Sequence, residues 1–336
     1  VATAPERCPM AEIQYRQFVP IALEAGQRSG LHHVSVAVID SGLAPGTGQF
    51  DTIPFLNLRG AAQSCQDADG HGTRVAGIIA ADNGDAAING IAARVLGANH
   101  MRLFVGEAHA LMDAVANLVL AGGSAGVDVV NMSVGSFYDN AGWAAAANAL
   151  FAVIITTYHD TLYVFPSGND DKEIGLHNTA PMALDLDNVI TVGGTAHCAP
   201  ETRWHSSDTF GSSWGSAVDI AAPGEDVLVQ YYYPGNDLSS GPPDQLSGTS
   251  YAAPMVASTA AVLAAFAPDA SPQQLRAAIL DNALPGPSDI GGARLQMALA
   301  LEQFLIDHDG SLAISELVDA DMNPGFRDNV GVVVNR

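Results

Sequence analysis

Short apolar segments rich in β-branched residues alternate along this chain with long alanine-rich segments, and this alternation limits the folds that it can adopt. The clearest apolar segments are residues 34–39, 127–131, 163–165 and 189–192. The segments typical of helices are residues 72–81, 109–122, 140–157, 250–266 and 272–283. Near-continuous apolar strands are expected when helices cover both faces of a sheet, and strands that alternate with helices imply parallel βαβ units. The sequence therefore predicts an α/β fold with three layers: a mostly parallel β-sheet with helices on both faces.

Changes in composition divide the chain into three parts. We expect residues 1–30 to form an amphipathic N-terminal arm, residues 31–305 the main domain, and residues 306–336 an acidic C-terminal appendage. Glycine, proline and tyrosine gather at residues 231–243, which predicts an exposed loop. In a sheet of the predicted kind, functional side chains gather at the carboxyl ends of the strands.

The charge of the chain excludes two classes of partner. The formal net charge is −23, and Lys172 is the only lysine. Nucleic acid requires a basic face, and anionic membranes attract basic segments, so we expect the protein to bind neither. The longest apolar run, residues 251–267, contains Pro254 and is too short to cross a membrane. It is predicted to be a buried core helix.

The three cysteines, Cys8, Cys65 and Cys198, are too few and too odd in number for a disulfide scaffold. One disulfide with one free thiol and three free thiols are equally compatible with the sequence. The chain begins at Val1 and shows no basic region followed by an apolar region of a signal peptide. A processed N-terminus and a trimmed sequence both fit this beginning.

Two motifs could supply an acid and a base. Asp40 is expected at the end of the strand 34–39, followed by Ser41-Gly42, where a carboxylate could orient a base. Taken alone, Asp-Ser-Gly is also a common turn. His71 lies in Asp-Gly-His-Gly-Thr-Arg-Val-Ala-Gly, in which glycines flank the histidine and small residues begin a helix. A lone histidine is usually structural, but this context is more specific.

Two further motifs could supply a nucleophile and an oxyanion donor. Ser250, in Ser-Gly-Thr-Ser-Tyr-Ala-Ala-Pro, opens the long apolar helix, so backbone N–H groups and the positive end of the helix dipole lie beside its hydroxyl. The alternative is an N-cap serine. Asn169, in Pro-Ser-Gly-Asn-Asp, follows a predicted strand and carries a neutral amide donor, although it could equally be a turn asparagine.

Together these four residues are the parts that peptide hydrolysis requires: an activated nucleophile, its base, a group that orients the base, and an oxyanion donor. Their motifs resemble the signature blocks of the subtilisin-like serine peptidases, in that family's order Asp, His, Asn, Ser. The resemblance covers residues 31–304. It implies a serine endopeptidase with the catalytic triad Asp40, His71 and Ser250, with Asn169 as the oxyanion donor, and with no organic cofactor.

The same resemblance implies where a polypeptide substrate binds. Ser133, Val134 and Gly135 are similar to the family's substrate-binding edge strand, and Pro166, Ser167 and Gly168 face it across the P1 pocket. Thr179 matches the base of that pocket, where the family often has glycine, which implies medium-sized apolar P1 residues; Asp170 at the rim could admit a basic one. The chain also departs from the family, because Arg74 replaces a usual non-catalytic histidine.

Calcium is the one metal that the sequence suggests, and no ligand set is certain. Residues 82–89 have the length of the family's calcium loop, but Gly84 replaces its usual asparagine ligand. In the appendage, Asp307, Asp309, the Ser311 carbonyl and Glu316 resemble the later part of an EF-hand loop, but Leu305 stands where its first aspartate belongs. The alternative is a solvated acidic segment.

Two other functions fit parts of the pattern. A peptide ligase or macrocyclase shares the same triad, but the sequence has no long insertion near His71 to act as a lid. A non-catalytic binding module would usually lack one of the four residues, and all four are present. By resemblance we expect a secreted, extracellular enzyme made with an inhibitory propeptide.

Overall fold

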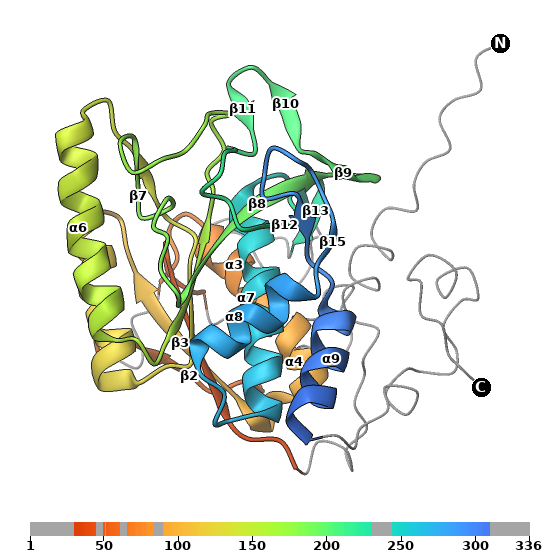
Figure 1. The fold of residues 1–336 in the computed structure, drawn as a ribbon. Helices are drawn as coiled ribbons and strands as arrows, with labels where there is room; N and C mark the ends of the chain where they lie inside the picture. Colours follow the sequence, from red (N-terminus) through yellow and green to blue (C-terminus); the bar gives the residue numbers. More distant parts are fainter. Residues whose placement is uncertain are drawn as a thin grey trace, which may run out of the picture.

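A ten-stranded, mostly parallel sheet forms the middle layer of the computed structural model, which describes residues 30–44, 50, 52–60, 66–82, 90–229 and 244–309 (Figure 1). In spatial order its strands are β15 (Leu284–Pro285), β16 (Ala293–Arg294), β12 (Ile220–Pro223), β8 (Val189–Ala196), β6 (Leu162–Pro166), β4 (Val129–Met132), β1 (Val34–Asp40), β3 (Met101–Glu107) and β2 (Phe55–Asn57), and β9 (Ala199–Arg203) pairs with β8. Only β15 and β9 run antiparallel to their neighbours in this sheet.

Helices cover both faces of the sheet (Figure 1). On one face lie α3 (His71–Ala80), α4 (Ile91–Leu96), α7 (Thr249–Phe266), α8 (Pro272–Asp281) and α9 (Met297–Asp309). On the other face lie α5 (Leu111–Leu120), extended by a π-helical turn (Ala121–Ala125), and α6 (Ala141–Thr157). The predicted three-layer α/β fold is therefore confirmed.

Shorter elements complete the part of the chain that the structure describes. They are a 3₁₀ turn (Ala98–His100) and three pairs of short strands: β5 (Ser136–Phe137) with β7 (Thr179–Ala180), β10 (His205–Ser207) with β11 (Phe210–Gly211), and β13 (Val227–Val229) with β14 (Asp244–Leu246).

Strand β1 shows why the strands are apolar throughout. Val36 and Val38 pack into the core beneath α3 and α7, whereas Ala37 and Ile39 pack into the core beneath α5 and α6. Successive side chains of a strand point to opposite faces, and here both faces are dry. A polar side chain in the middle of β1 would therefore be buried whichever face it took.

Helix α7 occupies the centre of one helical layer and packs across β6 and β8. In the described part of the chain it is the one helix long and apolar enough to span a membrane, but 83% of that segment is buried inside the fold. The prediction of a buried core helix is confirmed. Pro254 is the sixth residue of this helix, so it removes the hydrogen bond that an N–H there would make to the carbonyl of Ser250. That carbonyl accepts a hydrogen bond from the Ser133 hydroxyl instead.

The sequence pattern missed several elements, among them α4, β3 and α9. Strand β3 pairs with β1 near the centre of the sheet, but Arg102 and Gly106 interrupt its apolar run. Helix α9 runs to Asp309 and so continues past residue 306, where the appendage was predicted to begin. The three predicted parts of the chain remain a prediction, since most of residues 1–30 and 306–336 and all of the loop 231–243 lie outside the described residues.

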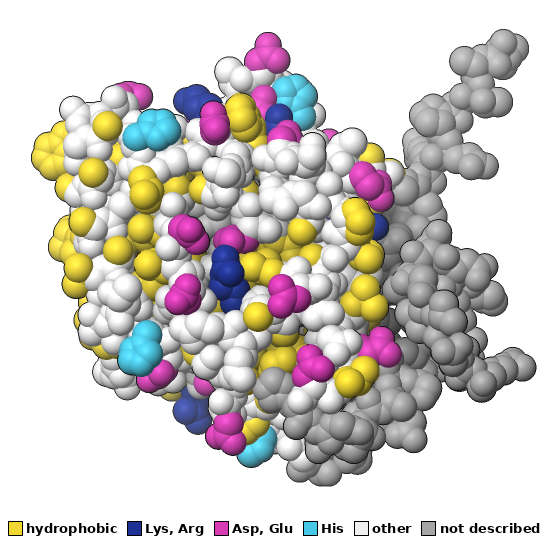
Figure 2. Space-filling model, viewed as in Figure 1, with side chains coloured by type: hydrophobic (Ala, Val, Ile, Leu, Met, Phe, Trp, Pro, Cys, Tyr) yellow, Lys and Arg dark blue, Asp and Glu magenta, His cyan; other side chains and the backbone are white. Residues whose placement is uncertain are grey.

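Acidic side chains are scattered over the surface shown in Figure 2, and the few basic ones lie among them. This agrees with 36 acidic and 13 basic residues in the chain. The face shown has no basic stripe that could follow a phosphate backbone.

Gly72 permits the close approach of α3 to the end of β1. A Cβ atom at Gly72 would lie 2.3 Å from the carbonyl oxygen of Gly42, which is backbone and cannot rotate away. We predict that Gly72→Ala lowers the free energy of unfolding by about 1–3 kcal/mol, as overpacking does. Gly30→Ala is the matched control, because nothing lies within 4 Å of a Cβ there. Urea unfolding of both variants tests this, and equal stability would contradict it.

Candidate active site

An acid and a base meet where β1 ends. Asp40, the last residue of β1, is 1% exposed. Its Oδ1 lies 2.7 Å from Nδ1 of His71, the first residue of α3, and also accepts a hydrogen bond from the backbone N–H of Ser41. A carboxylate that accepts a hydrogen bond from Nδ1 stabilises the imidazole tautomer whose proton is on Nδ1. This leaves Nε2 of His71 as the nitrogen that can accept a proton.

A second buried carboxylate, Asp67, holds the loop that carries His71, and the sequence analysis missed it. Its Oδ1 accepts hydrogen bonds from the Ser41 hydroxyl and from the N–H groups of Asp69 and Gly70. Its Oδ2 accepts bonds from the hydroxyl and the N–H of Thr73. Burial alone raises the pKa of Asp67, but these bonds outweigh burial and bring that pKa below its usual value. Its one signal in the sequence is its place four residues before His71.

Ser250 is the second residue of α7 and is 8% exposed. Its backbone carbonyl accepts a hydrogen bond of 3.1 Å from the Ser133 hydroxyl, and the amide of Asn131 donates to that hydroxyl in turn. Asn131 belongs to β4, so these bonds connect the start of α7 to the end of a central strand. Because Ser250 lies in the first turn of α7, the positive end of the helix dipole lies beside its hydroxyl.

The amide of Asn169 has a fixed orientation. Its Oδ1 accepts hydrogen bonds from the N–H and the hydroxyl of Thr249, both 2.9 Å. The Thr249 hydroxyl also accepts a bond from the N–H of Gly168. With its oxygen held in this way, Asn169 presents Nδ2 as a donor beside Gly248, where a Cβ atom would lie 3.5 Å from it.

These side chains line one cavity of about 370 Å³. It is lined by Asp40, Ser41, Asp69, His71, Ala108, Ser133, Val134, Gly135, Phe137, Pro166, Gly168, Asn169, Asp170, Met182, Thr249 and Ser250. The structure therefore brings together the four predicted catalytic residues and most of the predicted substrate-binding residues.

Ser167 and Thr179 do not line this cavity. Both are fully buried. The Ser167 hydroxyl donates to the carbonyl of Ser213, and the Thr179 hydroxyl donates to the carbonyl of Gly175. They lie in the wall, where they support neighbouring lining residues.

Phe137 and Met182 give the cavity apolar walls that the sequence did not indicate. Phe137 belongs to β5, which pairs with β7, and Met182 follows β7 after the cis bond between Ala180 and Pro181. A Cβ atom at Gly135 would lie 2.9 Å from the sulfur of Met182. Nothing in the local sequence of either residue indicates a binding role, because their position depends on the pairing of the two short strands.

Charges around His71 oppose one another. Burial alone lowers the pKa of His71, but the charge of Asp40 and the hydrogen bond to it outweigh burial, so this pKa lies above its usual value. Asp69 raises it further and Arg74 lowers it. Arg74 is buried and hydrogen-bonds to Tyr251, whose ring centre lies 5.6 Å from that of His71. Burial raises the pKa of Tyr251 to about 12, so its hydroxyl stays protonated at neutral pH.

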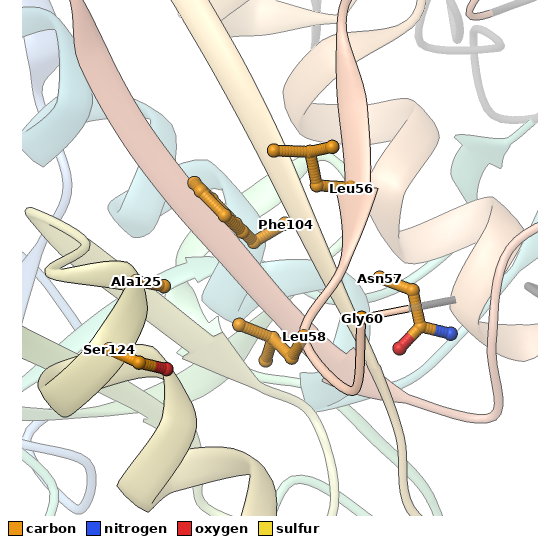
Figure 3. Close-up of a pocket in the computed structure, with 7 residues that line it drawn as sticks. All are labelled: Leu56, Asn57, Leu58, Gly60, Phe104, Ser124 and Ala125. Carbon is orange, nitrogen blue, oxygen red and sulfur yellow. The ribbon is translucent and has the colours of Figure 1, made fainter. Parts of the chain in front are cut away.

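A second cavity, of about 240 Å³, lies at the edge strand β2 (Figure 3). Its lining comes from β2 and the turn after it, from Phe104 of β3, and from Ser124 and Ala125 of the π-helical turn. This lining contains no ionisable side chain, so no acid or base among the lining residues stands beside the Ser124 hydroxyl.

The metal prediction remains open. Over residues 30–309, apart from the gaps given above, no group of three or more His, Cys, Asp or Glu side chains could hold a metal ion. Almost all of the predicted calcium loop at 82–89, and the appendage from residue 310, lie outside the described residues. Cys198, the one cysteine among the described residues, is disulfide-bonded, so the alternative of three free thiols was wrong. Cys8 and Cys65 lie outside the described residues.

Comparisons with known proteins agree with this geometry. Residues 32–308 match the profile described as the Subtilase family. Subtilisin BL of Lederbergia lenta is 31% identical over 305 residues, which cover 84% of this chain and 98% of that protein.

Solved structures match as well. The prenylagaramide maturation protease PagA has a TM-score of 0.62 at 24% identity, covering 82% of this chain and 95% of that one, a likeness that concerns the fold alone. The self-cleaved protease domain of PatA has a TM-score of 0.61 at 26% identity, covering 82% and 98%.

The two charges beside His71 predict opposite shifts of its pKa. Asp69→Asn removes a negative charge and should lower the pKa of His71, whereas Arg74→Met removes a positive charge and should raise it. NMR titration of the imidazole signals measures both, with His71→Gln to assign the signal. The other histidines serve as controls, and their pKa values should not change. Shifts in the same direction, or no shift in either variant, would contradict the electrostatic account.

Proposed function

This chain belongs to the subtilase family of serine peptidases and is a subtilisin-like serine endopeptidase, and from this premise we propose that Ser250 is its nucleophile. The observation that carries the assignment is the single cavity at which Ser250, the hydrogen-bonded pair of His71 and Asp40, and Asn169 meet. Nε2 of His71 accepts the proton of the Ser250 hydroxyl as the oxygen attacks the peptide carbonyl, which forms a tetrahedral intermediate. Asp40 orients the imidazole and stabilises its charged form.

Asn169 supplies a donor for the oxyanion of this intermediate. Its Nδ2 is free to do so because Thr249 occupies its Oδ1, and the first N–H groups of α7 add a second source of positive potential. His71 then gives its proton to the leaving amine, and the acyl group remains on Ser250. Water, activated by the same His71, releases the product and restores the serine.

The substrate is a polypeptide, and we propose that it binds as an added strand along Ser133–Gly135. Main-chain hydrogen bonds to an exposed strand edge give affinity without a sequence requirement. The P1 side chain enters between this segment and Pro166–Gly168. Val134, Phe137 and Met182 line the cavity with apolar surface, and Asp170 adds one carboxylate.

Hydrolysis is favoured over the two alternatives. A binding module would have no need of Asp40, His71, Asn169 and Ser250 at one cavity. It would also have no need of the hydrogen bond between His71 and Asp40. The two solved structures reported above are both described as proteases, and no observation favours ligation by this chain. Product masses, cleaved or cyclised, distinguish hydrolysis from ligation.

We also propose that the enzyme is secreted and is made with an inhibitory propeptide. The disulfide at Cys198 supports secretion, because disulfides persist in oxidising compartments. The relative PatA is described as self-cleaved, which supports maturation by proteolysis. The net charge of −23 supports the absence of nucleic-acid and membrane partners.

Ser250→Ala should retain the fold and lose several orders of magnitude in kcat, because the nucleophile is absent. A fluorescent peptide assay measures the rate, and circular dichroism checks the fold. A serine-directed phosphonylating reagent should label the wild-type protein at Ser250 alone, as shown by mass spectrometry of its peptides. Serine labelling at another position, or full activity in the alanine variant, would refute the assignment.

Medium-sized apolar P1 residues should be cleaved faster than tryptophan, because Phe137 and Met182 limit the cavity. Met182→Ala removes three heavy atoms from the wall and should raise kcat/KM for tryptophan relative to leucine by about tenfold or more, because a single methylene group in an apolar pocket already changes discrimination by about 10–200-fold. Met112→Ala is the control, because Met112 is 66% exposed on α5. A peptide library measures these preferences. Tryptophan as the best P1 residue of the wild type would contradict this view of the pocket.

A further inference from the structure

The segment that carries Asn169 is attached by its backbone to the strand that contains Gly211. The N–H of Gly211 donates to the carbonyl of Asn169, and the N–H of Asp171 donates to the carbonyl of Gly211, both at 3.1 Å. The N–H of Ser213 donates to the carbonyl of Gly168 at 2.8 Å. These bonds place residues 168–171 beside residues 211–213, which are the last residue of β11 and the two residues after it. Figure 1 shows the hairpin that β11 forms with β10.

Arg203, the last residue of β9, bonds to both of these segments. Its Nη1 donates to the carboxylate of Asp171 on one side and to the carbonyl of Ser212, at 2.6 Å, on the other. Its Nε donates to Asp289 at 2.8 Å. Nδ1 of His205 lies 3.0 Å from the second oxygen of Asp171. A planar guanidinium holds such an arrangement because its donors have fixed directions.

Asp171 has an uncommon backbone conformation. Its φ is 50°, in the left-handed region that a residue with a Cβ atom adopts at a cost. The side chains of Arg203 and Asp171 are only 16% and 10% exposed, so water competes weakly for their hydrogen bonds. Two residues before Asp171, the chain must present the Asn169 amide to Thr249 and to the cavity.

We propose that Arg203 is a positioning residue for the oxyanion donor: it holds residues 168–171 against residues 211–213 and thereby fixes the place of the Asn169 amide. This inference rests on the proposed role of Asn169. Arg203 does not line the cavity, so it acts on the reaction only through the backbone that it holds. Its loss should therefore lower kcat and change KM little, because the oxyanion exists only after the substrate has bound.

The chain offers a matched control in Arg276. Arg276, like Arg203, donates both to a carboxylate, Asp219 at 2.5 Å, and to a backbone carbonyl, that of Val189 at 2.7 Å, although Arg203 bonds a second carboxylate, Asp289. Its side chain is 25% exposed. Val189 is the first residue of β8, at the opposite end of that strand from the cavity. Arg276→Gln therefore removes the same kinds of bond without touching the oxyanion segment.

The experiment compares Arg203→Gln, Arg276→Gln, Asn169→Ala and the double variant Arg203→Gln/Asn169→Ala by steady-state kinetics and melting temperature. Asn169→Ala should lower kcat by about 10²–10³-fold, which is the loss of kcat given for removal of such a donor in subtilisin. Arg203→Gln should lower kcat by about tenfold with KM nearly unchanged, since displacing a donor is less severe than deleting it. Arg276→Gln should lower the melting temperature and leave kcat at the wild-type value.

The double variant decides how Arg203 acts. If Arg203 acts through Asn169, adding Arg203→Gln to Asn169→Ala should cause no further loss of kcat. A full additional tenfold loss would overturn the inference, and so would equal kcat values for Arg203→Gln and Arg276→Gln.

Failure of the inference and failure of the proposed function give different results. Wild-type kcat in Asn169→Ala would overturn the proposed role of Asn169, and the inference with it. A large loss in Asn169→Ala, with none in Arg203→Gln, would overturn the inference alone. If Arg203→Gln does not fold, Arg203→Lys replaces it in the double-mutant cycle. Lysine keeps the positive charge but cannot make all three hydrogen bonds of Arg203, so kcat should fall by less than tenfold. A wild-type kcat in Arg203→Lys would overturn the inference.

Discussion

Burial of the sheet on both faces is the constraint on which the rest of this structure depends. Because helices cover both faces, a polar side chain in the middle of a central strand could not reach substrate. The groups that must do so therefore stand where the strands end: Asp40 ends β1, Ser133 follows β4 and Asn169 follows β6. These three strands are neighbours in the sheet, so their carboxyl ends meet at one place, and α7 brings Ser250 to it.

In both His71 and Asn169, a hydrogen bond to one polar atom of the side chain orients the other polar atom toward the cavity. Asp40 holds Nδ1 of His71, which leaves Nε2 as the acceptor. Thr249 holds Oδ1 of Asn169, which leaves Nδ2 as the donor. Asp67 fixes the loop that carries His71, because it accepts hydrogen bonds from Gly70 and Thr73 on either side of that residue. Such bonds in a buried setting cost no reorganisation when charge develops in the reaction.

The chain has few cations, and three of them, one buried and two partly buried, connect parts of the fold. Arg74 lies beside His71 and Tyr251, Arg203 joins two segments next to the cavity, and Arg276 joins α8 to β8. Arginine suits these positions because one guanidinium can bond a carboxylate and a carbonyl together. The excess of acidic residues remains on the surface, where it favours solubility and does not determine the fold.

The sequence by itself determined the three-layer fold and pointed to Asp40, His71, Asn169 and Ser250, because each has a signal within a few residues: a strand end, flanking glycines or the start of an apolar helix. The walls of the site had no such signal. Phe137 and Met182 line the cavity only because β5 pairs with β7. Thr179, which belongs to β7, is fully buried and does not line the cavity. Arg203 and Asp171 are 32 residues apart in the chain. Contacts of this kind depend on the register and direction of paired strands, which only the packed tertiary structure decides.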